Sequence, residues 1–157
     1  MRKYYVAYGS NLSLTQFNSR CKDMKIVGTT VLNNYKLVFK GSADNYAYLT
    51  IEESPNSYVP LGVFEISEND ELALDLYENY PHLYHKEYIN ININNKEETA
   101  LIYVMKKSYN YHSPSFRYMI TCIMGYNQFG FDKSILEKAL RENPTIKRVK
   151  KKQKWQY

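Results

Sequence analysis

The turn Tyr8-Gly9-Ser10-Asn11-Leu12 contains residues that could bind a ligand through the backbone. A Gly-Ser-Asn turn can direct successive N–H groups at one point, and such a nest binds a carboxylate or a carbonyl oxygen without a charged side chain. Gly9 would also let a ligand approach the main chain closely. Taken alone, the segment fits an ordinary turn between a strand and a helix better than a binding site.

Glu78 is the candidate for proton transfer, within the segment 74–81, Leu-Asp-Leu-Tyr-Glu-Asn-Tyr-Pro. It is expected at the C-terminal end of a helix, where the helix dipole favours cations and therefore raises the pKa of a carboxyl group. Desolvation by the neighbouring tyrosines would raise that pKa further. A carboxyl group of this kind can shuttle a proton at neutral pH, whereas the alternative is a solvated glutamate at a helix end.

Tyr118 follows Pro114-Ser115 at the start of a predicted helix, and its hydroxyl could orient a polar substrate; the alternative is a core tyrosine. The chain has 17 tyrosines, which predicts that several are half-buried and that some line a polar pocket. His82 and His85 lack the partners of a zinc site, so no metal is expected. The sequence also shows no hydrolase elbow around Ser10 and no Gly-rich phosphate loop.

Strand patterns dominate the first half of the chain. Lys3–Tyr8 is a nearly continuous apolar run, and a short helix is expected after it, capped by Ser13 and ending near Arg20. Alternating apolar residues predict further strands at 35–39, 46–51 and 60–66, with turns at Gly41-Ser42 and Pro55-Asn56.

Longer helices are predicted after residue 66. Ser67 is an N-cap followed by acidic residues, with Leu72, Leu76 and Tyr77 as the apolar stripe and Glu78-Asn79 at the end. A hairpin is predicted from 88–93 and 99–105, then a helix from Ser115 that Gly125 interrupts and Gly130 ends, then a helix over Phe131–Glu142. This order predicts a closed or strongly curved mixed sheet in one domain, residues 1–143, with a basic tail, residues 144–157.

The charge distribution, the cysteines and the absence of long apolar runs indicate which class of protein this sequence encodes. The net charge of +5 comes from the tail, because six of the 21 Lys and Arg residues lie within residues 147–154. Cys21 and Cys122 lack metal-type spacing and are expected as reduced thiols in the cytoplasm. The N-terminus has no apolar core of a signal peptide, and no run approaches the ~20 apolar residues of a membrane helix.

Three blocks, in order, resemble the gamma-glutamyl cyclotransferase family, over residues from about 4 to 142. The blocks are the opening 5–12 with its Tyr-Gly-Ser-Asn-Leu signature, Leu74-Asp75-x-x-Glu78 followed by Tyr80-Pro81, and Pro114-Ser115-x-x-Tyr118 with Gly125 seven residues on. In this family the glutamate of the second block is catalytic. The sequence departs from the family at Asn79, where glycine is usual, and in the basic tail.

The resemblance implies an α+β fold, a small mixed β-barrel with flanking helices, and a pocket at the barrel mouth. It also implies an acyl-transfer (lyase-type) enzyme that cyclises a γ-glutamyl group to 5-oxoproline and releases an amino acid or amine, without cofactor or metal. Its partner would be a small γ-glutamyl molecule, and the protein would be a monomer or homodimer. The implied catalytic residue is Glu78, and the implied substrate-binding residues are Tyr5, Val6, Ala7, Tyr8, Gly9, Ser10, Asn11, Leu12 and Tyr118.

Two other functions fit the sequence. One is a non-catalytic small-molecule binding module of the same fold. The other is nucleic-acid binding through residues 147–154, with Trp155 and Tyr157 available to stack on bases. The retained Glu78 argues against the first alternative. The nearly balanced charge outside the tail and the lack of an RNA-binding motif argue against the second.

Overall fold

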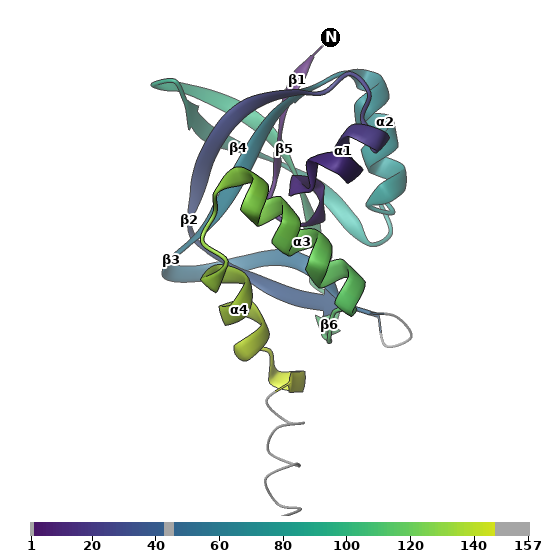
Figure 1. The fold of residues 1–157 in the computed structure, drawn as a ribbon, viewed down its shortest axis with the longest axis vertical. Coiled ribbons are helices and arrows are strands. Elements are labelled where there is room, and N and C mark those ends of the chain that lie inside the picture. Colours follow the sequence, from purple (N-terminus) through teal and green to yellow (C-terminus); the bar gives the residue numbers. More distant parts are fainter. Residues whose placement is uncertain (1, 43–45, 147–157) are drawn as a thin grey trace, which may run out of the picture.

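The structure is a computed structural model that describes residues 2–42 and 46–146 (Figure 1). One six-stranded mixed sheet, in the order β4-β5-β1-β3-β2-β6, curls into part of a barrel flanked by helices. The α+β barrel-like fold expected from the sequence is therefore confirmed. The elements are β1 (Lys3–Ala7), η1 (Ser10–Leu12), α1 (Leu14–Arg20), β2 (Lys25–Gly41), β3 (Tyr48–Ile66), α2 (Glu68–Tyr77), β4 (Tyr84–Ile93), β5 (Lys96–Met105), β6 (Asn110–Tyr111), α3 (Phe116–Phe129) and α4 (Ser134–Arg141).

Strand β1 lies inside the sheet and places the first candidate segment. It pairs antiparallel with β3, with Ala7 opposite Gly62, and parallel with β5, with Tyr5 opposite Leu101. Val6 and Ala7 are fully buried, as expected for a strand that is covered on both faces. Because β1 ends in the core of the molecule, the turn that follows it also lies in the core.

The long β2–β3 hairpin corrects one expectation. Pro55-Asn56 was predicted to separate two strands, but β3 is continuous from Tyr48 to Ile66. The pairing register shifts between Asn33 and Tyr35 instead, and Asn34 and Asn56 both have φ 65°, which asparagine tolerates. The segment is thus a bulge in a paired strand, and bulges of this kind bend a sheet.

Helix α2 begins as predicted, but its apolar stripe is not buried. The Ser67 hydroxyl accepts a hydrogen bond from the Asp70 amide, and the Asp70 side chain accepts one from the Ser67 amide. Leu72 and Leu76 are 62% and 85% exposed, whereas Leu74 is fully buried. The expectation that Leu72 and Leu76 face the core is therefore wrong, because α2 rests on the core along its Leu74 side.

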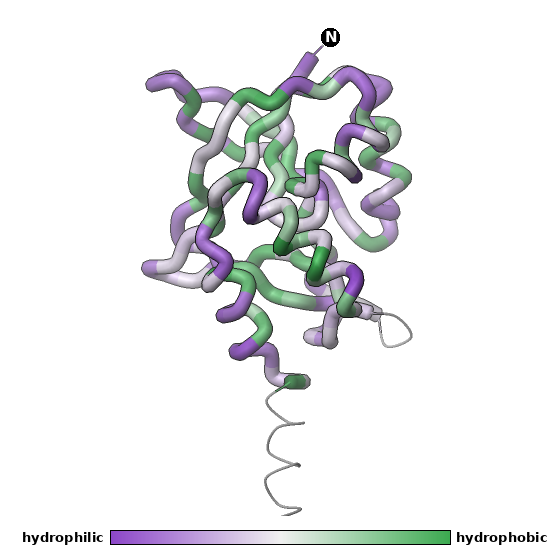
Figure 2. Tube along the Cα trace, viewed as in Figure 1, coloured by the Kyte–Doolittle hydropathy of each residue, from purple (hydrophilic) through white to green (hydrophobic). Residues whose placement is uncertain are grey.

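Helix α3 crosses the site region without a break, so the predicted interruption at Gly125 is wrong. The Ser115 side chain caps its start by accepting from the Tyr118 amide, and Gly130, with φ 70°, ends it as predicted. Hydrophobic residues gather in α3 and in the central strands, while the turn between β4 and β5 is hydrophilic (Figure 2). Helix α4 begins at Ser134, later than predicted, because Phe131 packs on Tyr126 before the helix starts.

Cys21 and Cys122 are buried free thiols, as expected from their spacing. Within the described residues, no helix is long and apolar enough to cross a membrane. The predicted basic tail spans residues 144–157; residues 144–146 are described and helical, and residues 147–157 lie outside the described part of the chain.

Candidate functional site

The turn after β1 is fixed by tight packing around Leu12. The Leu12 amide donates to the Gly9 carbonyl at 3.0 Å, and the Ser13 amide donates to the Ser10 carbonyl at 3.0 Å. A Cβ atom at Gly62 would lie 2.6 Å from Leu12 Cδ2, and one at Gly125 would lie 2.6 Å from Leu12 Cβ. Both glycines therefore let β3 and α3 close on η1, and this explains why α3 needs a glycine at its centre.

Glu78 directly follows α2, as predicted. Its amide donates to the Leu74 carbonyl at 2.8 Å, and the next amide, of Asn79, donates to the Leu76 carbonyl at 3.2 Å. Asn79 has φ 51°, in the left-handed region that glycine, the usual residue of the family here, adopts without strain. Asparagine tolerates this left-handed conformation better than most residues, and the helix end is preserved.

Asn11 connects the first turn to Glu78. Its Nδ2 donates to Glu78 Oε1 at 3.2 Å and to the Tyr5 hydroxyl at 3.0 Å. Arg20 Nη1 donates to the Asn11 Oδ1 atom, and the guanidinium lies 3.4 Å from the centre of the Tyr77 ring. Two of the segments chosen from the sequence therefore meet in the fold, and Arg20 joins them although no sequence pattern pointed to it.

Burial raises the pKa of Glu78 to about 8, and the nearby Arg20 charge opposes this rise. The predicted direction of the shift is confirmed, and desolvation is its largest cause. The Glu78 charge adds to the raised pKa values of Tyr5, Tyr84 and Tyr118, for which burial is the main cause. At neutral pH these tyrosines are uncharged hydrogen-bonding groups, and Glu78 is the group poised to gain or lose a proton.

Tyr118 brings the third segment to the same place. Its hydroxyl accepts a hydrogen bond from the Leu49 amide at 3.0 Å and would lie 3.3 Å from a Cβ atom at Gly9. Its ring packs edge-on against Tyr48 with 5.1 Å between the ring centres. Tyr118 is thus half-buried between the turn and β3, with its ring and hydroxyl held in place.

Residues from all three candidate segments line a cavity of about 270 Å³. Ser10, Glu78 and Tyr118, one from each candidate segment, all line it, and the Ser10 hydroxyl lies 2.7 Å from the Tyr77 hydroxyl. The other predicted binding residues do not line the cavity. Tyr5 and Asn11 stand behind Glu78. The remaining predicted residues are buried: Val6, Ala7, Tyr8, Gly9 and Leu12. Four other lining residues were not predicted from the sequence: Tyr48, Tyr77, Leu83 and Tyr84. The abundance of tyrosine was a general signal for the three tyrosines, and nothing pointed to Leu83.

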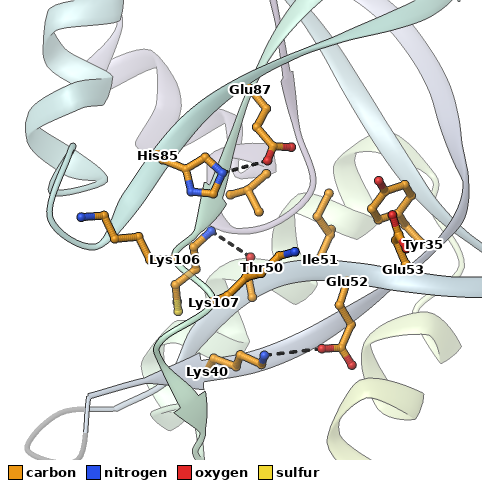
Figure 3. A pocket seen from close by; sticks show the side chains of 12 residues that line it. Tyr35, Lys40, Thr50, Ile51, Glu52, Glu53, His85, Glu87, Lys106 and Lys107 are labelled. Carbon is orange, nitrogen blue, oxygen red and sulfur yellow. Dashed lines mark hydrogen bonds and ion pairs between the residues drawn. The ribbon is translucent and has the colours of Figure 1, made fainter.

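A larger cavity, of about 360 Å³, lies between β2–β3 and β4–β5 (Figure 3). Its charged side chains largely pair with one another: His85 Nε2 lies 2.8 Å from Glu87 Oε1, and Lys40 Nζ lies 3.5 Å from Glu52 Oε2. Glu78 lines the smaller cavity instead, and burial raises its pKa to about 8. In the described chain, no three His, Cys, Asp or Glu side chains are grouped to hold a metal ion. The smaller cavity is therefore the candidate site for proton chemistry.

Comparisons with known proteins identify the family and the fold. The family model described as "Gamma-glutamyl cyclotransferase, AIG2-like" matches residues 5–119. An uncharacterized protein of Homo sapiens has a similar structure, with 25% identity, a TM-score of 0.77, and coverage of 88% of this chain and 86% of that one. A solved structure called "Gamma-glutamyl cyclotransferase" has 22% identity and a TM-score of 0.77, and the match covers 97% and 99% of the two chains. YkqA from Bacillus subtilis has 17% identity and a TM-score of 0.76, with 91% of this chain and 55% of that chain covered. A search of curated proteins found no match.

Proposed function

Because this chain belongs to the gamma-glutamyl cyclotransferase, AIG2-like family, we propose that it cyclises a γ-glutamyl group to 5-oxoproline. The α-amine of that group attacks its own side-chain carbonyl carbon. A new C–N bond closes the five-membered ring, the original amide C–N bond breaks, and an amine or amino acid leaves. Starting from the ammonium form, the attacking nitrogen loses two protons, and the leaving nitrogen gains one to depart as an amine and a second to become an ammonium ion.

The observation that carries this proposal is the position of Glu78. Among the described residues it is the only carboxyl group that lines the cavity, and burial raises its pKa to about 8. An acid in this range can both accept and return a proton at neutral pH, which is worth roughly 10²–10⁴-fold in rate. One carboxyl group thus serves both nitrogens of the reaction.

The substrate itself would help to create the base. In the free protein at pH 7 a pKa of about 8 keeps Glu78 mostly protonated. An incoming α-ammonium group places a positive charge beside the carboxyl group, which favours the carboxylate and lowers its pKa. The carboxylate then removes a proton from the ammonium, and the amine attacks. The protonated acid donates to the departing nitrogen, and the regenerated carboxylate then takes the second proton from the ring nitrogen and passes it to the released amine.

The turn at Gly9-Ser10 would hold the negative part of the substrate. The first amides of a helical turn have no partner within the turn, and η1 begins at Ser10. These amides would bind the substrate carboxylate or the oxyanion that develops at the attacked carbonyl. The fixed rings of Tyr84 and Tyr118 would hold the substrate folded, so that the amine lies close to the carbonyl.

The direct test is to incubate the full chain with γ-glutamyl-alanine and to measure 5-oxoproline by mass spectrometry. The wild-type chain should form it, and Glu78→Gln should reduce kcat by at least ~10²-fold. Glu53→Gln is the matched control, since Glu53 is an exposed glutamate that lines only the other cavity. A fully active Glu78→Gln protein would exclude the proposed role of this acid. A wild-type chain that binds γ-glutamyl-alanine but never forms 5-oxoproline would instead be a binding module.

A further inference from the structure

The candidate cavity has a closed inner end and an exposed outer end. Ser10 and Tyr84 at the inner end are 7% and 5% exposed. At the outer end Tyr48 is 38% exposed and Asn79 is exposed, while Tyr77, 39% exposed, reaches inward with its hydroxyl 2.7 Å from that of Ser10. A ligand that spans the cavity therefore has one part enclosed by polar groups and another part against rings at the rim.

The proposed reaction fixes which part of the substrate lies at which end. The attacking amine must reach Glu78, and the carboxylate of the same glutamyl group is expected at the Ser10 turn. The γ-glutamyl part thus fills the inner end, and the leaving group lies at the outer end. The cavity of about 270 Å³ is slightly below the ~300–1,000 Å³ of sites for drug-sized ligands, so it fits a leaving group of about one amino acid.

The outer end is lined by apolar and aromatic groups that are held in place. The Tyr48 ring packs edge-on against Tyr118. Leu83 is half-buried, its amide donates to the Asn79 carbonyl at 2.9 Å, and its carbonyl accepts from the Lys106 amide at 3.0 Å. Among the described lining residues no Lys or Arg is present to pair with an acidic leaving group.

We propose that this chain prefers γ-glutamyl substrates whose leaving group is aromatic or bulky and apolar, and that Tyr48 and Leu83 set this preference. The proposal rests on the proposed function and narrows its substrate class. A leaving-group ring gains contact with the Tyr48 ring and the Leu83 methyl groups, and aromatic pairs of this kind contribute beyond the area they bury. An acidic leaving-group side chain adds a further carboxylate at the outer end, where none of the described lining residues is a Lys or Arg that could pair with it.

The test compares three dipeptides with the full chain: γ-glutamyl-phenylalanine, γ-glutamyl-alanine and γ-glutamyl-glutamate. Initial rates of 5-oxoproline release give kcat/KM for each. The phenylalanine substrate should exceed the alanine substrate by roughly fivefold to fiftyfold, the range expected from added apolar contact in a pocket. The glutamate substrate should be the poorest of the three. Equal values for all three would overturn this inference and leave the proposed function standing, whereas no product from any would refute the proposed function.

Single substitutions test which residues set the preference for an aromatic leaving group. Tyr48→Ala and Leu83→Ala should each lower the ratio of kcat/KM for the phenylalanine substrate over the alanine substrate by at least about threefold. Tyr48→Phe keeps the ring and should keep the ratio. Tyr88→Ala and Leu72→Ala are matched controls, because both residues are exposed, at 56% and 62%, and neither lines the cavity. Unchanged ratios in Tyr48→Ala and Leu83→Ala, with the folded state verified by circular dichroism, would exclude these residues as determinants.

Discussion

Replacing Glu78 with glutamine should make the protein more resistant to alkaline pH. Burial raises the pKa of Glu78 from its ordinary value of 4.5 to about 8 in the folded chain. Between these two pH values the folded chain binds more protons than the unfolded chain. The free energy of unfolding therefore falls as the pH rises through this window. A neutral glutamine at the same position lacks this dependence and can still accept the hydrogen bond from Asn11.

The size of the effect follows from the two pKa values. Each pH unit of difference corresponds to about 1.36 kcal/mol. Between pH 5 and pH 9 the wild-type protein should lose up to about 4 kcal/mol relative to Glu78→Gln, and relaxation around the charged carboxylate would reduce this to ~2 kcal/mol. Even the smaller value is a large part of a typical stability of about 5–15 kcal/mol.

Urea unfolding of both proteins at pH 5, 7 and 9, followed by circular dichroism, measures this difference. All other titrating groups are shared, so their contributions cancel when the two proteins are compared at each pH. The advantage of Glu78→Gln should grow steadily from pH 5 to pH 9. A difference that stays constant within about 0.5 kcal/mol would show that Glu78 is ionised and solvated, and the proposed proton shuttle would then lack its raised pKa.

Three further predictions concern the groups around this acid. The kcat/KM of the wild-type protein should rise with pH toward a midpoint near 8, and Arg20→Ala should move that midpoint upward, because the Arg20 charge lowers the pKa of Glu78; an unmoved midpoint in pH–rate profiles would contradict the assignment. Gly125→Ala should destabilise the fold by about 1–3 kcal/mol in urea unfolding, since the added Cβ would lie 2.6 Å from Leu12 Cβ and the adjacent backbone cannot yield. Asn79→Gly should leave the unfolding midpoint unchanged or higher, whereas Asn79→Ala should lower stability by ~1 kcal/mol because φ is 51° there; equal midpoints for the two variants would contradict this.

Much of the fold could be predicted because burial leaves a periodic pattern in the sequence. β1 and the start of α2 have a continuous apolar run and a capping residue, and both were predicted close to their actual bounds. Alternation located the β4–β5 hairpin, but β4 begins at Tyr84 and β5 at Lys96, four and three residues earlier than predicted. The first half of β2 gave no such signal. Residues 25–34 are mostly exposed or half-buried, so a paired strand there has no alternating apolar face to detect.

The contacts that build the site could be predicted only in part. Ser10, Glu78 and Tyr118 were found because each lies in a short recognisable segment, and the cavity brings them together. Arg20 and Leu83 belong to no such segment. Their positions depend on how α1 and the start of β4 pack against the turn and α2, and such long-range packing is not encoded in local spacing.

The way in which Arg20 approaches Glu78 matters for the chemistry. A guanidinium bound directly to the carboxylate would hold its pKa well below neutral, and the acid could then not return a proton. Arg20 instead donates to the Asn11 side-chain oxygen, and the Asn11 nitrogen donates to Glu78 Oε1. The amide thus orients the carboxyl group and keeps the cation one residue away from it. Burial remains the stronger influence on Glu78, so its pKa stays in the range where one acid can act on both nitrogens.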